Sequence, residues 1–179
     1  MRTLQTELAG HKYAHVERER RWLAHPNRRP SLDGLPHVRI EDRYIDGARL
    51  RLRRMTDSAT GAVSLKLGKK YETGDPLARP MVTTYLDAAE YALLETLPAR
   101  PIVKRRYQLP GMAGPFSFDA FEGALAGLAL IEIEMSDDAS LRALDAPAWA
   151  GREVSADPDY EGGSLARNGM PKETAWPNF

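Results

Sequence analysis

Cysteine is absent from this chain of 179 residues, which excludes disulfides, thiolate metal sites and cysteine nucleophiles. Long apolar runs are absent as well. The longest, residues 124–131, is far shorter than the roughly 20 residues that a membrane-spanning helix needs. Residues 1–18 contain no apolar run that could serve as a secretory signal. We therefore expect a soluble, cytoplasmic protein with no membrane partner.

The chain also has no excess of charge of either sign. Lys plus Arg and Asp plus Glu each number 25, so the formal net charge is zero. Bulk charge therefore does not favour nucleic acid as a partner, and a polyanion site would require local segregation of positive from negative charge. The four histidines, at positions 11, 15, 25 and 37, do not show the spacing of metal ligands, although His15 shares strand parity with Glu17.

What the chain does contain is the composition of an ordinary globular protein, with 42% hydrophobic and 28% charged residues. The chain is long enough for one domain with a hydrophobic core and too short for two domains of typical size. We expect a single domain over residues 1–179.

Apolar and polar residues alternate with a period of two in several segments. Residues 49–53 read RLRLR, residues 116–119 read FSFD and residues 131–135 read IEIEM. In residues 103–107, VKRRY, the cations Lys104 and Arg106 share one face. This period is typical of half-buried strands.

One helix is expected at residues 88–97. Asp87 is a good N-cap, Glu90 follows three residues later as in a capping box, and Pro98 marks the end. Shorter helices are expected around residues 147–154 and 163–168. The outline is mostly antiparallel β-structure with a few helices, which is the α+β class.

The polar faces of these strands each carry charge of a single sign. Any one of them, taken alone, is most simply a solvated face. If the strands instead close into a barrel with these faces inward, the interior is a charged cavity and helices cover the apolar faces outside. The residues by themselves leave both interpretations open.

The charged faces suggest a specific chemistry if they meet. Crowded carboxylates repel one another unless a cation neutralises them, and all-oxygen ligation suits Mg²⁺ or Mn²⁺. Converging Lys and Arg side chains bind phosphate oxygens. The candidate carboxylates are Glu17, Glu19, Asp119, Glu132 and Glu134, and the candidate cations are Arg21, Arg49, Arg51, Arg53, Lys66, Lys70, Lys104 and Arg106. Together they predict a site for a metal–polyphosphate complex.

An ordered set of motifs resembles the CYTH superfamily, the class IV adenylyl cyclase and thiamine triphosphatase group, also called triphosphate tunnel metalloenzymes. The resemblance runs from about residue 13 to residue 166. Glu17–Trp22 matches the family's E-x-E-x-K strand, Arg51–Arg53 its R-x-R strand and Leu65–Lys70 the basic strand that follows. Lys104–Tyr107 matches the K-x-R-Y pattern and Phe118–Phe121 the aspartate strand. Glu132–Glu134 matches the second E-x-E, and Glu153–Ala166 matches the closing segment.

The resemblance implies a closed antiparallel tunnel of eight strands with helices packed outside, holding a triphosphate and Mg²⁺ or Mn²⁺. It implies catalytic roles for Glu17, Glu19, Arg21 and Lys70, phosphate binding by Arg51, Arg53, Lys66, Lys104 and Arg106, and metal binding by Glu17, Glu19, Asp119, Glu132 and Glu134. Within Leu65–Lys70, Lys70 is the best match to the basic residue of the family's strand, and Lys66 is the second-best match.

Two departures from the family pattern bear on function. Arg21 stands where the family has lysine, and residues 82–85, VTTY, occupy a strand where many members carry acidic residues. The expected activity is hydrolysis of a triphosphate, most simply inorganic tripolyphosphate. The alternatives are an adenylyl cyclase that makes cyclic AMP from ATP and a non-catalytic module that binds polyphosphate or a nucleotide.

Overall fold

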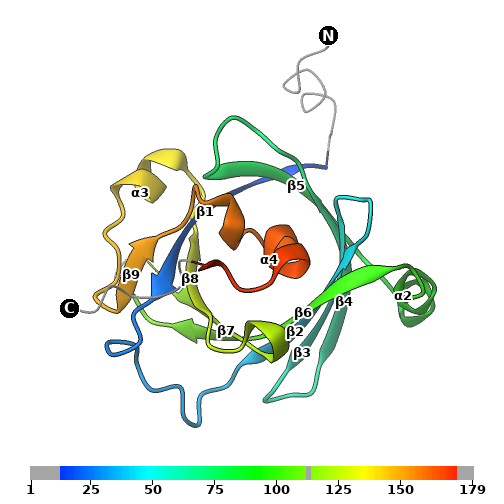
Figure 1. Cartoon of the computed structure of the whole chain (residues 1–179), viewed down its shortest axis with the longest axis horizontal. Coiled ribbons are helices and arrows are strands. Elements are labelled where there is room, and N and C mark those ends of the chain that lie inside the picture. The colour runs from blue at the N-terminus through cyan, green and yellow to red at the C-terminus, as the bar shows by residue number, and fades with distance from the viewer. Residues whose placement is uncertain (1–12, 112–113, 173–179) are drawn as a thin grey trace.

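The computed structural model describes residues 13–111 and 114–172 and shows an antiparallel barrel (Figure 1). Its strands are β1 (His15–Ala24), β2 (Val38–Ile45), β3 (Leu50–Asp57), β4 (Val63–Lys70), β5 (Ala78–Tyr85), β6 (Ala99–Leu109), β7 (Phe116–Phe121), β8 (Ala129–Glu134) and β9 (Ala150–Glu153). The order around the sheet is β5-β4-β3-β2-β6-β7-β8-β1, and pairing of β1 with β5 closes it. The short β9 pairs with the end of β1. The expected closed barrel of eight antiparallel strands is confirmed.

Helices pack on the outside of the barrel and at one end of it. They are α2 (Ala88–Glu95), α3 (Asp138–Ala143) and α4 (Gly162–Asn168), with 3₁₀ turns η1 (Gly123–Leu125) and η2 (Pro158–Tyr160). The capping box at the start of α2 is present: the Asp87 side chain accepts from the Glu90 backbone N–H, and the Glu90 side chain accepts from the Asp87 backbone N–H. The helix expected at residues 163–168 is confirmed as α4.

Two elements differ from the sequence-based expectation. The helix expected around residues 147–154 is wrong, because Ala150 and Glu153 pair with Ala24 and Trp22 of β1 as part of β9. The backbone of β1 offers hydrogen-bond partners to β9, and this pairing outweighs the weak helical signals in the sequence of the segment. The helix α3 was not expected; its N-cap is Asp137, whose side chain accepts from the Ser140 backbone N–H.

Apolar residues form two clusters on opposite sides of the barrel wall. The outer cluster, on the outward faces of β1, β6, β7 and β8, includes Trp22, Phe118 and Ile131 and is covered by Leu141 of α3. The inner cluster fills one end of the barrel.

The inner cluster consists of residues that point into the barrel, joined by the C-terminal segment. Leu23, Ile102 and Leu130 pack there against Tyr160 of η2 and Leu165 of α4. Viewed along the barrel, α4 lies across this end (Figure 1). The apolar filling stops partway along the interior, and charged side chains occupy the remainder.

No helix in the described ranges is both long enough and apolar enough to cross a membrane.

Candidate active site

The barrel encloses a cavity of about 600 Å³, and each of its eight strands contributes lining residues. The lining cations are Arg21, Arg49, Arg51, Arg53, Lys66, Lys69, Lys70, Arg79, Lys104, Arg106 and Arg167. The lining carboxylates are Glu17, Glu19, Asp42, Asp46, Glu72, Glu132 and Glu161. Eleven cations thus face seven carboxylates, although the whole chain is neutral. The barrel segregates charge and creates an interior with an excess of positive groups.

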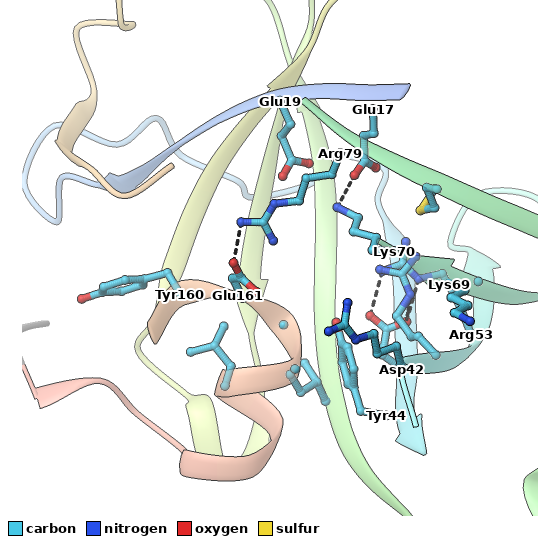
Figure 2. Close-up of a pocket in the computed structure, with 18 of the residues that line it drawn as sticks. Glu17, Glu19, Asp42, Tyr44, Arg53, Lys69, Lys70, Arg79, Tyr160 and Glu161 are labelled. Carbon is cyan, nitrogen blue, oxygen red and sulfur yellow. Dashed lines mark hydrogen bonds and ion pairs between the residues drawn. The ribbon is translucent and has the colours of Figure 1, made fainter. Parts of the chain in front are cut away.

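Two glutamates of β1 point into the cavity (Figure 2). Glu17 forms an ion pair with Lys70 of β4. Burial alone would raise the pKa of Glu17, but the charge and hydrogen bond of Lys70 outweigh it and lower that pKa. For Glu19, burial and the nearby Glu132 carboxylate raise the pKa above its ordinary value. The environments of these two glutamates therefore push their pKa values apart.

Arg21 links β1 to β8 and to the C-terminal segment. Its Nη2 donates to Glu19 Oε1 at 2.5 Å, its Nε donates to Glu132 Oε1 at 2.9 Å, and its Nη1 donates to the Tyr160 carbonyl at 2.9 Å. Burial favours the neutral form of Arg21, but Glu19 and Glu132 outweigh it and raise its pKa. Arg21 is therefore a fixed cation between two carboxylates.

A second group of charges joins β6, β7 and β8. Asp119 is fully buried and accepts from Lys104 and, through two hydrogen bonds of 2.7 and 2.6 Å, from Arg106. Arg106 also donates to Glu132. Burial lowers the pKa of Lys104, although Asp119 opposes the shift. This group holds the two cations of the K-x-R motif against the cavity wall.

A third group joins β2 and β3. Asp42 accepts two hydrogen bonds from Arg53, at 2.6 and 2.7 Å, and lies 3.7 Å from Arg51 Nε. That Arg51 Nε atom is buried without a hydrogen-bond partner among the described residues. A buried donor without a partner carries an energetic cost, and Arg51 bears this cost beside Asp42.

The pairing of Asp42 predicts a specific dependence of stability on pH. Burial would raise the pKa of Asp42, but Arg53 and Arg51 outweigh it and lower that pKa to about 2. A carboxylate with a lowered folded-state pKa stabilises the fold above its unfolded-state pKa of about 3.9, and this contribution disappears as the pH falls through about 2. Asp42→Asn is therefore expected to lower the free energy of unfolding by about 2.5 kcal/mol at pH 7. Urea denaturation of both proteins from pH 7 to pH 2 measures the difference, which should shrink below about pH 4; a difference independent of pH would contradict the assignment.

Comparison with known proteins agrees with this geometry. The chain is 34% identical over 77 residues to an inorganic triphosphatase of Acetivibrio thermocellus, a match that covers 42% of this chain and 48% of that protein. The chain thus spans about half the length of this curated relative. No protein-family model matches the sequence.

Two solved structures share the barrel over nearly their whole length. The hypothetical protein NE1496 has a TM-score of 0.55 at 24% identity, with 84% of this chain and 97% of that chain covered. The inorganic triphosphatase NE1496 has a TM-score of 0.56 at 22% identity, with 85% and 95% covered. The chain shares the closed barrel fold of these two structures. The expected resemblance is confirmed at the level of the fold.

Most of the residues predicted for the site line the cavity inside the barrel, which we call the tunnel. These are Glu17, Glu19, Arg21, Arg51, Arg53, Lys66, Lys70, Lys104, Arg106 and Glu132. Arg18 and Arg20, on the opposite parity of β1, bond outside the tunnel to Asp138 and Glu153 respectively.

Two of the predicted metal ligands lie outside the tunnel lining. Asp119 stands behind Lys104 and Arg106 with no exposed surface. Glu134, at the end of β8, has a side chain that is 50% exposed, and its Oε1 lies 3.0 Å from His15 Nε2. The structure therefore brings Glu17, Glu19 and Glu132 together without Asp119 or Glu134.

The tunnel residues missed from the sequence include Asp42, Tyr44, Arg79 and Glu161. The first two belong to β2, whose sequence VRIEDRYI does not alternate cleanly. Arg79 precedes Pro80 in β5, and proline within a run argues against a paired strand. Glu161 lies in the closing segment of residues 153–166, whose sequence shows no period-two alternation. The shared parity of Ile40, Asp42 and Tyr44 is the one signal that could have revealed part of this set.

The tunnel carboxylates are of the right type for a hard divalent cation. Glu17, Glu19 and Glu132 affect one another's pKa values through their charges, and carboxylate oxygens are the ligands that Mg²⁺ and Mn²⁺ prefer. Within the described residues, no three His, Cys, Asp or Glu side chains are grouped as metal ligands. Lys70, Arg21 and Arg106 form ion pairs with these carboxylates. These carboxylates are chemically suited to bind a divalent metal. Metal binding requires that the cations now paired with them pair with another anion.

Proposed function

We propose that the protein hydrolyses a triphosphate in its tunnel, with inorganic tripolyphosphate as the simplest substrate and Mg²⁺ or Mn²⁺ as cofactor. The observation that carries this proposal is the enclosed cavity in which eleven cations face seven carboxylates. A small polyanion is the ligand that such an interior favours most. The partial match to a protein named inorganic triphosphatase supports hydrolysis as the reaction.

The tunnel residues divide into two sets under this proposal. Arg51, Arg53, Lys66, Lys104 and Arg106 bind phosphate oxygens, with the arginines able to do so bidentately. Glu17, Glu19 and Glu132 would hold the metal in a complex in which Lys70 and Arg106 pair with phosphate oxygens instead. The metal supplies further charge neutralisation during phosphoryl transfer.

The cationic set also explains how hydrolysis is assisted. Water adds to the terminal phosphorus, the bond to the bridging oxygen breaks, and negative charge develops on the leaving pyrophosphate. Cations on several strands of a closed barrel are held in place before the reaction, so they stabilise that charge without reorganising. No covalent intermediate is required.

Phosphate release is the direct test of this function. Tripolyphosphate, thiamine triphosphate and ATP are each incubated with the protein and Mg²⁺ or Mn²⁺. We expect the fastest release from tripolyphosphate, and a loss of more than about 100-fold when a chelator removes the metal. Absence of release from all three substrates with both metals would contradict the proposal.

The products separate the alternatives. A cyclase converts ATP into cyclic AMP and pyrophosphate, whereas hydrolysis never yields the cyclic nucleotide. A binding module binds tripolyphosphate in a calorimetric titration and releases no phosphate. Either result would replace the hydrolase assignment.

A further inference from the structure

One cation of the tunnel is directed away from the others. Arg79 of β5 extends across the cavity to the C-terminal segment, where its Nη2 lies 2.5 Å from Glu161 Oε1 (Figure 2). The two residues are 82 positions apart in the sequence. Both line the cavity, so this ion pair spans the space that a tunnel ligand enters.

The strand register offers Arg79 another carboxylate, which it does not use. Glu17 of β1 is the Cα partner of Arg79 across the β1–β5 pairing that closes the barrel. Glu17 forms its ion pair with Lys70 instead. Arg79 thus stands beside the carboxylates of the proposed catalytic site while its charge is engaged by the C-terminal segment.

Glu161 is held firmly by the residues around it. Its neighbour Tyr160 is 1% exposed and Leu165 is 2% exposed, and both belong to the inner apolar cluster. The backbone N–H of Glu161 donates to the Pro158 carbonyl at 3.2 Å, and its own carbonyl accepts from Leu165 at 2.9 Å. Because the Glu161 backbone is anchored, the long side chain of Arg79 is the part of this pair that is free to rearrange.

We propose that Glu161 is a positioning residue that holds Arg79 away from bound phosphate and so sets the affinity of the tunnel for anions. The inference rests on the proposed function and concerns its selectivity. An anion that recruits Arg79 must break the pair with Glu161 and leave that carboxylate without its partner. The Glu161 side chain is 37% exposed, so water solvates part of the carboxylate left behind and reduces this cost. A highly charged ligand such as tripolyphosphate offsets the remaining cost better than orthophosphate or pyrophosphate, which are therefore held more weakly.

Glu161→Gln tests the inference through binding, measured by calorimetric titration with tripolyphosphate and with pyrophosphate. We expect the Kd for both anions to fall by about threefold to tenfold, because Arg79 becomes available at no cost. A purely structural role for Glu161 predicts the reverse, since a loosened C-terminal segment would weaken binding. Glu161→Ala provides a second charge-removing variant, and circular dichroism verifies that each variant is folded.

A double-mutant cycle isolates the coupling between the two residues. In an Arg79→Gln background, Glu161→Gln should no longer tighten binding. The matched control is Glu72→Gln, which removes another lining carboxylate whose partner, Arg49, lies 3.1 Å away with a side chain that is 51% exposed. We expect that control to change the Kd by less than about twofold.

The outcomes distinguish this inference from the proposed function. Unchanged or weaker binding in both Glu161 variants, or tighter binding that persists without Arg79, overturns the inference while phosphate release by the unmodified protein upholds the function. If the unmodified protein neither binds nor hydrolyses tripolyphosphate, the proposed function itself is overturned.

Discussion

Replacing Glu132 with Gln is expected to lower the turnover of tripolyphosphate by about 10²–10³-fold. Glu132 is 7% exposed and lies where the charged groups of the tunnel meet. Burial alone would raise its pKa, but Arg21, Lys104, Arg106 and Lys70 together hold that pKa well below its usual range. The carboxylate is therefore a fixed negative charge among four cations.

The size of this effect follows from two losses in one substitution. Gln has nearly the shape of Glu but no charge, so it removes a candidate metal ligand. It also weakens the ion pairs that position Arg21 and Arg106. Both losses act on charge stabilisation during phosphoryl transfer, so kcat should fall more than KM rises. Initial rates of phosphate release over a range of tripolyphosphate concentrations separate the two constants.

Glu134→Gln is the matched control for this experiment. The E-x-E motif treats Glu132 and Glu134 alike, but the structure places Glu134 beside His15 with half of its side chain exposed. We expect Glu134→Gln to change turnover by less than about threefold. Equal losses in the two variants would contradict the assignment of Glu132 alone to the tunnel.

The largest expected loss of stability comes from Asp119→Ala. Asp119 has no exposed surface and pairs with Lys104 and Arg106. Its removal leaves two cations at the tunnel wall without their shared carboxylate, and breaking a buried ion pair in this way typically costs about 3–5 kcal/mol. For a chain of this length the melting temperature should fall by about 6–20 °C. Differential scanning calorimetry measures the change.

An exposed ion pair of the same chemistry serves as the comparison. Asp46 lies 3.3 Å from Arg100, and about half of each side chain is exposed. Asp46→Asn should change the free energy of unfolding by less than about 1 kcal/mol. If Asp119→Ala is no more destabilising than this variant, the Asp119 pairs do not hold the tunnel wall together.

Much of the barrel was predictable from the sequence because strand alternation is a local property. The runs RLRLR and IEIEM show that Arg51, Arg53 and Glu132 share the face opposite to their apolar neighbours. The same argument places Glu17, Glu19 and Arg21 on one face of β1, and the structure shows Arg18 and Arg20 on the other. The ordered motifs then indicated that these faces meet in one tunnel.

What alternation could not determine is which charges pair. Arg21 and Glu132 meet through the long-range pairing of β1 with β8, and Arg79 and Glu161 meet only through the return of the C-terminal segment. Strand β2 was missed because its inward residues, Ile40, Asp42 and Tyr44, mix apolar and polar types. Alternation also does not show where the tunnel ends. Glu134 has the same parity as Glu132 but lies outside the tunnel lining.

The sequence by itself therefore determined which of these cations and carboxylates share a strand face, because the period of a strand assigns each side chain to a face. Only the tertiary structure decided that Asp119 supports the wall rather than lining the tunnel, that Arg21 is held between two carboxylates, and that Glu161 engages Arg79. The physical reason is that Coulomb interactions depend on distance and burial in three dimensions, and neither quantity is encoded by spacing along one strand.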